Sequence, residues 1–197
     1  MPVLCYNKIM ENVGYIEKNN LKLGFGKNDI NDIIGNIEFG SRDEVELRDD
    51  VVQLICAGVI FTDKEILTLK KSKQATGENS AEQGKTLLYV GGHLDEIDNA
   101  DDFVATLKNG MKREILEELN YSVNENCIGN PLIVYTPINE KSKRHLGVIF
   151  PIQISNKFNT NFTDGKCKFV DIGKVEHIDN LEEWSKIILK ELIKQKI

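Results

Sequence analysis

Residues 113–119 read Arg-Glu-Ile-Leu-Glu-Glu-Leu, and the pair Gly91-Gly92 precedes them in the chain. On a helix, Glu114, Glu117 and Glu118 lie at positions i, i+3 and i+4, so their carboxylates share one face. Carboxylates this close repel each other, and Mg²⁺ offsets the repulsion because it prefers oxygen ligands. An apolar stripe that can pack against a sheet lies opposite and comprises Met111, Ile115 and Leu119. The stretch therefore predicts a metal-binding helix in a protein that acts on phosphorylated compounds.

The composition is that of a folded protein. The 197 residues suffice for one domain with a substantial core, and 41% hydrophobic with 28% charged residues exclude wholesale disorder. A formal net charge of −6 argues against general nucleic-acid binding and against binding to anionic membranes. A small phosphorylated substrate stays compatible with this charge, because a bound cation reverses the local field.

The cysteines and the apolar runs limit the protein class further. Cys5, Cys56, Cys127 and Cys167 have no paired spacing, so we expect reduced thiols rather than a zinc site or a redox pair. The start of the chain lacks the basic and apolar regions of a signal peptide. No run approaches the roughly eighteen apolar residues of a membrane span. We expect a cytoplasmic protein without a membrane contact.

The first half of the chain predicts a hairpin followed by a long helix. Residues 1–50 are treated as an N-terminal extension packed on the same domain, with a short strand at 3–6 and a helical turn at 29–34. Residues 52–61 and 65–70 read as paired strands, and 74–85 as a polar loop. A strand at 86–90 should end at Gly91-Gly92. The helix should run from about 101 to 119, although Asn109-Gly110 allows a break.

The second half adds strands and a closing helix. Strands are expected at 127–136, 147–154 and 166–172, with Pro151 indicating an edge strand or a bulge. Residues 181–196 form an amphipathic pattern in which Leu181, Trp184, Ile188 and Leu192 share one face. Strands and helices in this order predict an α/β fold with a sheet packed between helices.

The order of strand, glycine pair, acidic loop and charged helix resembles the Nudix hydrolase signature, G-x5-E-x7-R-E-U-x-E-E-x-G-U, in which U is bulky and aliphatic. The resemblance covers about residues 51–197. It implies the Nudix fold, a mixed β-sheet between α-helices, with residues 1–50 outside the signature. It also implies a Mg²⁺- or Mn²⁺-dependent hydrolase that cleaves a pyrophosphate bond in a nucleoside diphosphate-linked or related compound.

The resemblance assigns roles to the matching residues. Glu117 and Glu118 match the metal-binding pair, and Glu114 matches a glutamate that binds metal or handles the attacking water. Arg113 matches the arginine that orients these glutamates, and Gly91 matches a glycine whose carbonyl is a further metal ligand. The implied catalytic residues are Glu114, Arg113 and Glu117.

The signature is altered before the helix. Gly92 and the five-residue spacing lead to Asp98, a shorter carboxylate where the family has glutamate. Residues 99–112 make fourteen intervening positions where the signature has seven, and counting back from Arg113 leads to Ala105 instead. Asn120 replaces the glycine after the helix, and asparagine tolerates the left-handed conformation of a helix cap.

Several other residues are candidates for substrate contact. Gly92, His93 and Arg144 are predicted to bind substrate, and basic side chains that could attract a polyphosphate are Lys70, Lys71, Lys73, Lys141, Lys143 and His145. A late loop could supply a further acid from Glu140 or Glu176. Trp184 and Phe150 are expected in the core.

Three alternatives stay open at this point. The charged helix face could be merely solvated, since isolated charge runs usually are. The altered signature is also compatible with a catalytically weak nucleotide-binding or regulatory module on the same scaffold. A homodimer is compatible with the sequence as well, because nothing in it sets the oligomeric state.

Overall fold

The structure is a computed structural model that describes residues 11–26, 30–33, 37–72, 82–137, 142–159, 162 and 165–194. The predicted strand at 3–6 and most of the predicted loop at 74–85 lie outside these ranges. The described elements are β1 (Asn12–Glu17), η1 (Lys18–Asn20), β2 (Gly24–Phe25), α1 (Ile30–Ile33), β3 (Glu38–Ser41), α2 (Arg42–Val45), β4 (Val51–Phe61), β5 (Glu65–Lys71), β6 (Val90–His93), η2 (Glu96–Asp98), α3 (Phe103–Leu119), η3 (Glu125–Cys127), β7 (Leu132–Tyr135), β8 (His145–Gln153), β9 (Gly165–Asp171), α4 (Ile172–Val175) and α5 (Glu183–Lys194).

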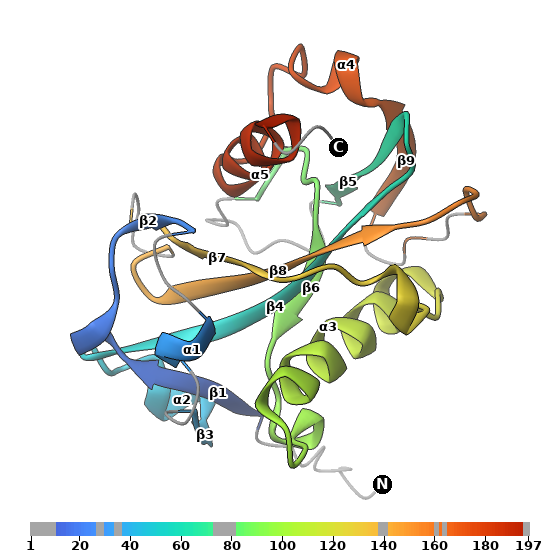
Figure 1. Ribbon diagram of the computed structural model, residues 1–197. Helices are drawn as coiled ribbons and strands as arrows, with labels where there is room; N and C mark the ends of the chain where they lie inside the picture. Colours follow the sequence, from blue (N-terminus) through green and yellow to red (C-terminus); the bar gives the residue numbers. More distant parts are fainter. Residues whose placement is uncertain are drawn as a thin grey trace, which may run out of the picture.

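The centre of the fold is β4, the long strand of a mixed sheet that contains nine strands within the described ranges (Figure 1). On one side β8 runs parallel to β4 from Gln53, opposite His145, to Phe61, opposite Gln153. On its other side β4 pairs in turn with β1, β6 and β5, all antiparallel. The β4–β5 hairpin confirms the sequence prediction. This shared edge brings β6, with its glycine pair, beside the middle of β4.

Alternate residues of β4 face different helices. A Cβ added at Gly58 would lie 2.7 Å from Cδ1 of Ile115 and 3.4 Å from the sulfur of Met111, so this face meets α3. Ile55 points the opposite way and lines a cavity together with Trp184 of α5. Figure 1 shows α3 and α5 on opposite sides of the sheet. The predicted α/β fold class, a mixed β-sheet between α-helices, is confirmed.

Both ends of α3 have identifiable caps. The Asp102 carboxylate accepts a hydrogen bond from the Ala105 amide at 2.8 Å, and Asn120 adopts the left-handed conformation with φ 50° and ψ 40°. The helix is continuous through Gly110, so the break that Asn109-Gly110 allowed does not occur. Gly110 instead permits close packing, since a Cβ there would lie 3.0 Å from Leu94.

The predicted strand at 86–90 is misplaced. Thr86 and Leu87 make only isolated bridges, and β6 begins at Val90 and continues through both glycines to His93. The strand was expected to end at the glycines because they are turn formers. Because they lack a side chain, the two glycines instead allow β6 to lie close to β4 and to α3.

Two further boundaries differ from the prediction. Chain 127–131 is not a strand, and β7 starts at Leu132, opposite Ile149. The edge position predicted from Pro151 is wrong, because β8 pairs with β4 and β7 on its two sides. Pro151 follows the last β7 pair, and its carbonyl accepts a hydrogen bond from Gly129 at 2.8 Å. The missing proline N–H therefore interrupts no ladder.

Residues before 51 contribute to the same sheet. Strand β1 pairs with β4 through Ile16, opposite Val52, and β3 pairs with β1. A small apolar cluster joins them and comprises Val13, Tyr15, Val45 and Val51. The division of the chain at residue 50 stays a prediction. No helix in the described part of the chain is long and apolar enough to cross a membrane.

Candidate functional site

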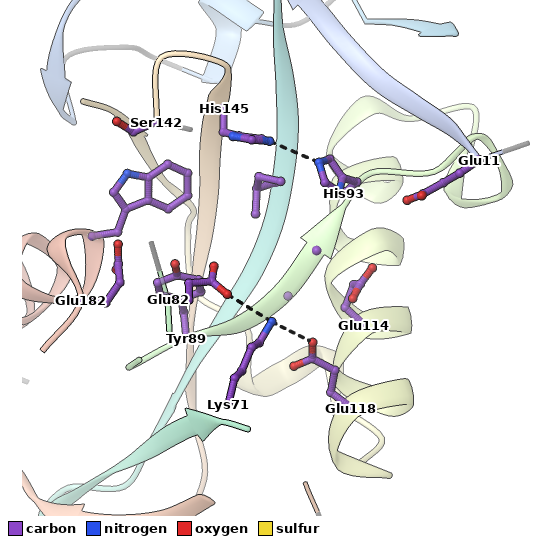
Figure 2. A pocket seen from close by; sticks show the side chains of 14 residues that line it. Glu11, Lys71, Glu82, Tyr89, His93, Glu114, Glu118, Ser142, His145 and Glu182 are labelled. Atoms are coloured by element: carbon purple, nitrogen blue, oxygen red, sulfur yellow. Dashed lines mark hydrogen bonds and ion pairs between the residues drawn. The ribbon is translucent and has the colours of Figure 1, made fainter. Parts of the chain in front are cut away.

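A cavity of about 260 Å³ opens between α3, β6 and the start of α5 (Figure 2). Its walls combine acidic, basic and aromatic side chains with the glycine pair. The lining residues are Glu11, Ile55, Lys71, Glu82, Tyr89, Gly91, Gly92, His93, Glu114, Glu118, Ser142, His145, Glu182 and Trp184.

Two of the three helix glutamates line this cavity. The side chains of Glu114 and Glu118 are only 15% and 13% exposed, whereas that of Glu117 is 60% exposed. Burial raises the pKa of Glu114, although the neighbouring Arg113 guanidinium opposes the rise. A carboxylate with a raised pKa accepts a proton more readily, which suits a group that handles water.

A lysine ammonium lies between two carboxylates of the cavity. Lys71, at the end of β5, places its Nζ 3.5 Å from an oxygen of Glu118 and 3.5 Å from an oxygen of Glu82 (Figure 2). All three side chains are at least four-fifths buried. Partly buried charges are retained when they are paired, so this end of the cavity is built to hold positive charge.

Arg113 connects α3 with the loop before it. Its Nε and Nη2 donate to the two oxygens of Asp98 at 2.9 and 3.0 Å, and Nη2 also donates to the His93 carbonyl at 3.0 Å. Nη1 donates to Glu114 at 2.8 Å and to Glu117 at 3.3 Å. Burial alone would lower the pKa of Arg113, but these carboxylates raise it, so the guanidinium stays charged. The paired N–H groups fix the guanidinium on Asp98, and the remaining Nη1 then orients the Glu114 carboxylate.

The pairing of Asp98 with Arg113 shows how the longer connection is accommodated in the fold. Asp98 is 4% exposed and reaches Arg113 despite the longer connection, because the additional residues form a loop and the first turns of α3. Ala105, the other candidate by spacing, lies in the first turn of α3, where its amide donates to the Asp102 cap and its methyl side chain offers no ligand atom.

The two glycines have different neighbours. A Cβ on Gly92 would lie 2.5 Å from the carboxylate carbon of Glu114, the flexible end of a side chain. A Cβ on Gly91 would overlap the Cys56 carbonyl oxygen and the backbone of Ala57, which cannot move independently of β4. The first glycine is needed for the sheet, and the second leaves room for a carboxylate.

Alanine at these adjacent positions should therefore give opposite results. We expect Gly91→Ala to lower the free energy of unfolding by roughly 3 kcal/mol through overpacking. Gly92→Ala should change stability by less than about 1 kcal/mol, because Glu114 can rotate away, and should lower activity at least about tenfold. Urea unfolding and initial rates measure both effects. Equal loss of stability in the two variants would contradict this assignment.

Two histidines face each other across the cavity. The Nε2 atoms of His93 on β6 and His145 on β8 are 3.3 Å apart, and their rings are tilted by 57°. A hydrogen bond across this contact needs one ring nitrogen to donate and the other to accept. His145 was predicted only as part of a basic loop, and the parallel β4–β8 pairing brings it to the site.

Other predicted site residues lie elsewhere. Arg144 donates to the Glu46 carbonyl at 2.6 Å and does not line the cavity. Glu117 lies outside the cavity lining, and Glu176 is exposed beside His177. Glu140 lies outside the described residues.

Several lining residues were not predicted as site residues. Trp184 was expected only in the core, while Glu82, Tyr89 and Glu182 were not singled out. The spacing of Glu182 and Ser185 is typical of a helix start, and the Glu182 carboxylate accepts from the Ser185 amide at 3.1 Å. No local pattern could have indicated Glu82, because its ion pair with Lys71, the partner of Glu118, depends on the tertiary fold.

The residues present fit a magnesium ion. No group of three or more His, Cys, Asp or Glu side chains converges to hold a metal within the described ranges. Mg²⁺ needs fewer protein ligands, since it commonly binds one or two carboxylates and completes its shell with water and substrate phosphates. Glu114 and Glu118 line the cavity and supply such oxygens.

Comparisons with known proteins place this arrangement in a structural context. No family model and no curated protein matches the sequence. Tm1382, a candidate Nudix hydrolase, matches with a TM-score of 0.74 and 23% identity, over 94% of this chain and 100% of its own. The NUDIX domain of Shewanella oneidensis NrtR, solved with ADP ribose, matches with a TM-score of 0.57 and 14% identity, over 74% of this chain and 89% of that domain.

A third match is part of a longer protein. The bifunctional NMN adenylyltransferase/ADP ribose pyrophosphatase of Francisella tularensis, solved with AMP and a manganese ion, has a TM-score of 0.57 and 15% identity. The match covers 74% of this chain and 42% of that protein. These identities are too low to transfer an activity, but the shared architecture is clear. The chain has the Nudix fold.

Proposed function

We propose that the protein is a Mg²⁺-dependent hydrolase that cleaves a pyrophosphate bond in a nucleoside diphosphate-linked compound. The observation that carries the proposal is the cavity in which Glu114 and Glu118 lie beside the glycine pair and Lys71. Support also comes from solved relatives of the same fold, one described as an ADP ribose pyrophosphatase and another solved with ADP ribose. Mn²⁺ has similar ligand preferences and is an alternative ion.

The proposed reaction assigns a task to each side chain. A bound Mg²⁺ would neutralise charge on the phosphoryl oxygens and lower the pKa of a water molecule. Glu114 and Glu118 would hold the ion, with the Gly91 carbonyl and a rotated Glu117 as further ligands. Arg113 keeps Glu114 in position, as its 2.8 Å hydrogen bond indicates. The charge of Lys71 suits a phosphate oxygen of the substrate.

The proposed hydrolysis needs no reactant other than water and the substrate. The oxygen of water attacks one phosphorus atom, and the bridging P–O bond breaks with its electron pair going to the leaving phosphate. The proton released by water passes to a carboxylate of the cavity, for which Glu114 is the candidate because Arg113 holds it in position. Two phosphate monoesters, or one monoester and inorganic phosphate, are the products.

A release assay tests this function directly. Purified protein with Mg²⁺ or Mn²⁺ should release a nucleoside monophosphate or phosphate from at least one nucleoside di- or triphosphate, dinucleotide or nucleotide sugar. EDTA should abolish the release, and added Mg²⁺ should restore it. Absence of turnover across this panel with both metals would refute the hydrolase.

A binding module is the second candidate. The shorter Asp98 and the fourteen residues at 99–112 depart from the signature on which the catalytic roles rest. Nucleotide binding without turnover in the same panel would favour this function.

A further inference from the structure

The two histidines of the cavity have ring nitrogens close enough to share one ion. Nε2 of His93 and Nε2 of His145 are 3.3 Å apart, and both side chains line the cavity. Zinc–nitrogen bonds measure about 2.0–2.1 Å, so two nitrogens at this separation subtend about 105° at a metal ion bonded to both. That angle is close to the tetrahedral angle that Zn²⁺ adopts in proteins. The spacing of the pair therefore suits a shared metal ion as well as a shared proton.

Both histidines belong to strands that pair with β4. His93 lies opposite Ile55 in the ladder of β6 and β4, and His145 lies opposite Gln53 in the ladder of β8 and β4. Arg113 also donates to the His93 carbonyl at 3.0 Å. Ligands placed on strands hold their geometry more precisely than ligands on loops, so little ordering is needed when an ion binds.

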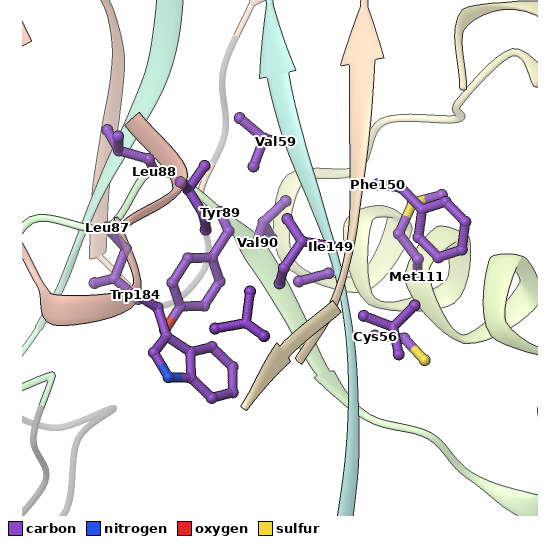
Figure 3. Packing of buried hydrophobic residues seen from close by; sticks show 14 of the residues in the cluster. Cys56, Val59, Leu87, Leu88, Tyr89, Val90, Met111, Ile149, Phe150 and Trp184 are labelled. Carbon is purple, nitrogen blue, oxygen red and sulfur yellow. The ribbon is translucent and has the colours of Figure 1, made fainter. Parts of the chain in front are cut away.

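Core packing fixes the same two strands. Val90 of β6 and Ile149 of β8 are buried in the central hydrophobic cluster (Figure 3). The Trp184 ring packs against Gly147, two residues after His145, where an added Cβ would lie 2.8 Å from Cζ3. The backbone at each histidine is therefore held in place, and only side-chain torsions have to adjust around an ion.

The charge of the cavity favours a cation. Its described lining residues include five glutamates and one lysine, which are Glu11, Glu82, Glu114, Glu118, Glu182 and Lys71. A cavity lined mainly by one sign of charge concentrates ions of the opposite sign. Figure 2 shows the histidine pair at one end of the cavity and Lys71 with Glu118 at the other. Imidazole nitrogens suit Zn²⁺ whereas Mg²⁺ prefers oxygen ligands, so the two ends suit different ions.

We propose that His93 and His145 bind a transition-metal ion, for which Zn²⁺ is the best fit, at a site separate from the carboxylates of α3. Each ring coordinates the ion through Nε2, so the ring that donates in the contact between the histidines shifts its proton to Nδ1. Water or a phosphate oxygen completes the coordination, as at the open position of a catalytic zinc site. The inference goes beyond the proposed function and does not depend on turnover, because it concerns ion binding alone.

Zn²⁺ calorimetry on the untagged protein tests this site, and the third of the three histidines in the chain supplies a matched control. His93→Gln and His145→Gln each remove one donor and should weaken Zn²⁺ binding at least about tenfold. The His177 side chain is 76% exposed beside Glu176, so His177→Gln should keep the wild-type affinity within about twofold. Unchanged affinity in either of the first two variants, as binding by the cysteine thiols would give, or equal loss in all three would overturn the proposal.

Competition with Mg²⁺ separates this site from the proposed catalytic one and needs no variant. Excess Mg²⁺ should leave the Zn²⁺ affinity of the wild-type protein unchanged within about threefold, since Mg²⁺ prefers oxygen ligands. Displacement of Zn²⁺ by Mg²⁺ would place the ion on the carboxylates and overturn the histidine site. Absence of Zn²⁺ binding in an active hydrolase would overturn the histidine site alone. The predicted Zn²⁺ binding in a protein without turnover would refute the hydrolase and leave the histidine site standing.

Discussion

Replacing Glu118 or Glu114 by glutamine is expected to lower the turnover number on the order of 10³-fold, because each change removes a charged metal ligand. Both side chains line the cavity and are mostly buried, so neither solvent nor the remaining amide oxygen replaces the lost negative charge. Glutamine has almost the same volume, and it should leave the fold unchanged. Initial rates at saturating Mg²⁺ measure the effect, and Mn²⁺ calorimetry should show weaker metal binding in the same variants.

Glu117→Gln is the matched control on the same helix. Its side chain is 60% exposed and pairs with Arg113 at 3.3 Å, so it joins the site only after a change of rotamer. We expect it to retain at least about tenfold more activity than Glu118→Gln. Equal activity in all three variants and the wild type would show that the cavity is not the catalytic site. Equal loss in all three would show that Glu117 is a full metal ligand.

The sequence predicts the parts of the site that depend on local spacing. The helix 103–119 and the position of Glu114 and Glu118 on one side of it follow from a 3.6-residue period and a glycine pair. The hairpin of β4 and β5 follows equally from two apolar runs and a short polar turn. These features are encoded within a few residues of each other, so they can be read without the fold.

Contacts between distant elements were not predictable in this way. Lys71 meets Glu118 because β5 and α3 both approach the end of β6, and His145 meets His93 because β8 runs parallel to β4. The course of β6 through Gly91 was also missed, since a glycine in a sequence indicates a turn as readily as a close approach. The Glu117 side chain lies apart from the cavity because it pairs with Arg113, and Arg113 is in turn oriented by Asp98.

The pairing of Asp98 with Arg113 gives the second large prediction, which concerns stability. Asp98→Ala should lower the free energy of unfolding by about 3–5 kcal/mol, because it leaves a mostly buried guanidinium without its main partner. The change also removes the acceptor for the Asp95 amide at 2.9 Å, which belongs to the cap of η2. For a chain of this length the midpoint of thermal unfolding should fall by roughly 6–20 °C. Scanning calorimetry and urea unfolding measure the loss.

Two control variants distinguish the loss of the Asp98–Arg113 ion pair from a general effect of removing an aspartate. Asp101→Ala removes an exposed carboxylate from the same loop, and it should alter stability by less than about 0.5 kcal/mol. The double variant Asp98→Ala/Arg113→Met should be more stable than Asp98→Ala alone, because it removes the uncompensated charge as well. It should still be inactive, since nothing would then hold Glu114 toward the cavity. The losses in free energy of unfolding of Asp98→Ala and Arg113→Met could instead simply add in the double variant. The charge pair would then not connect the loop to α3, and the altered signature would have a different structural basis.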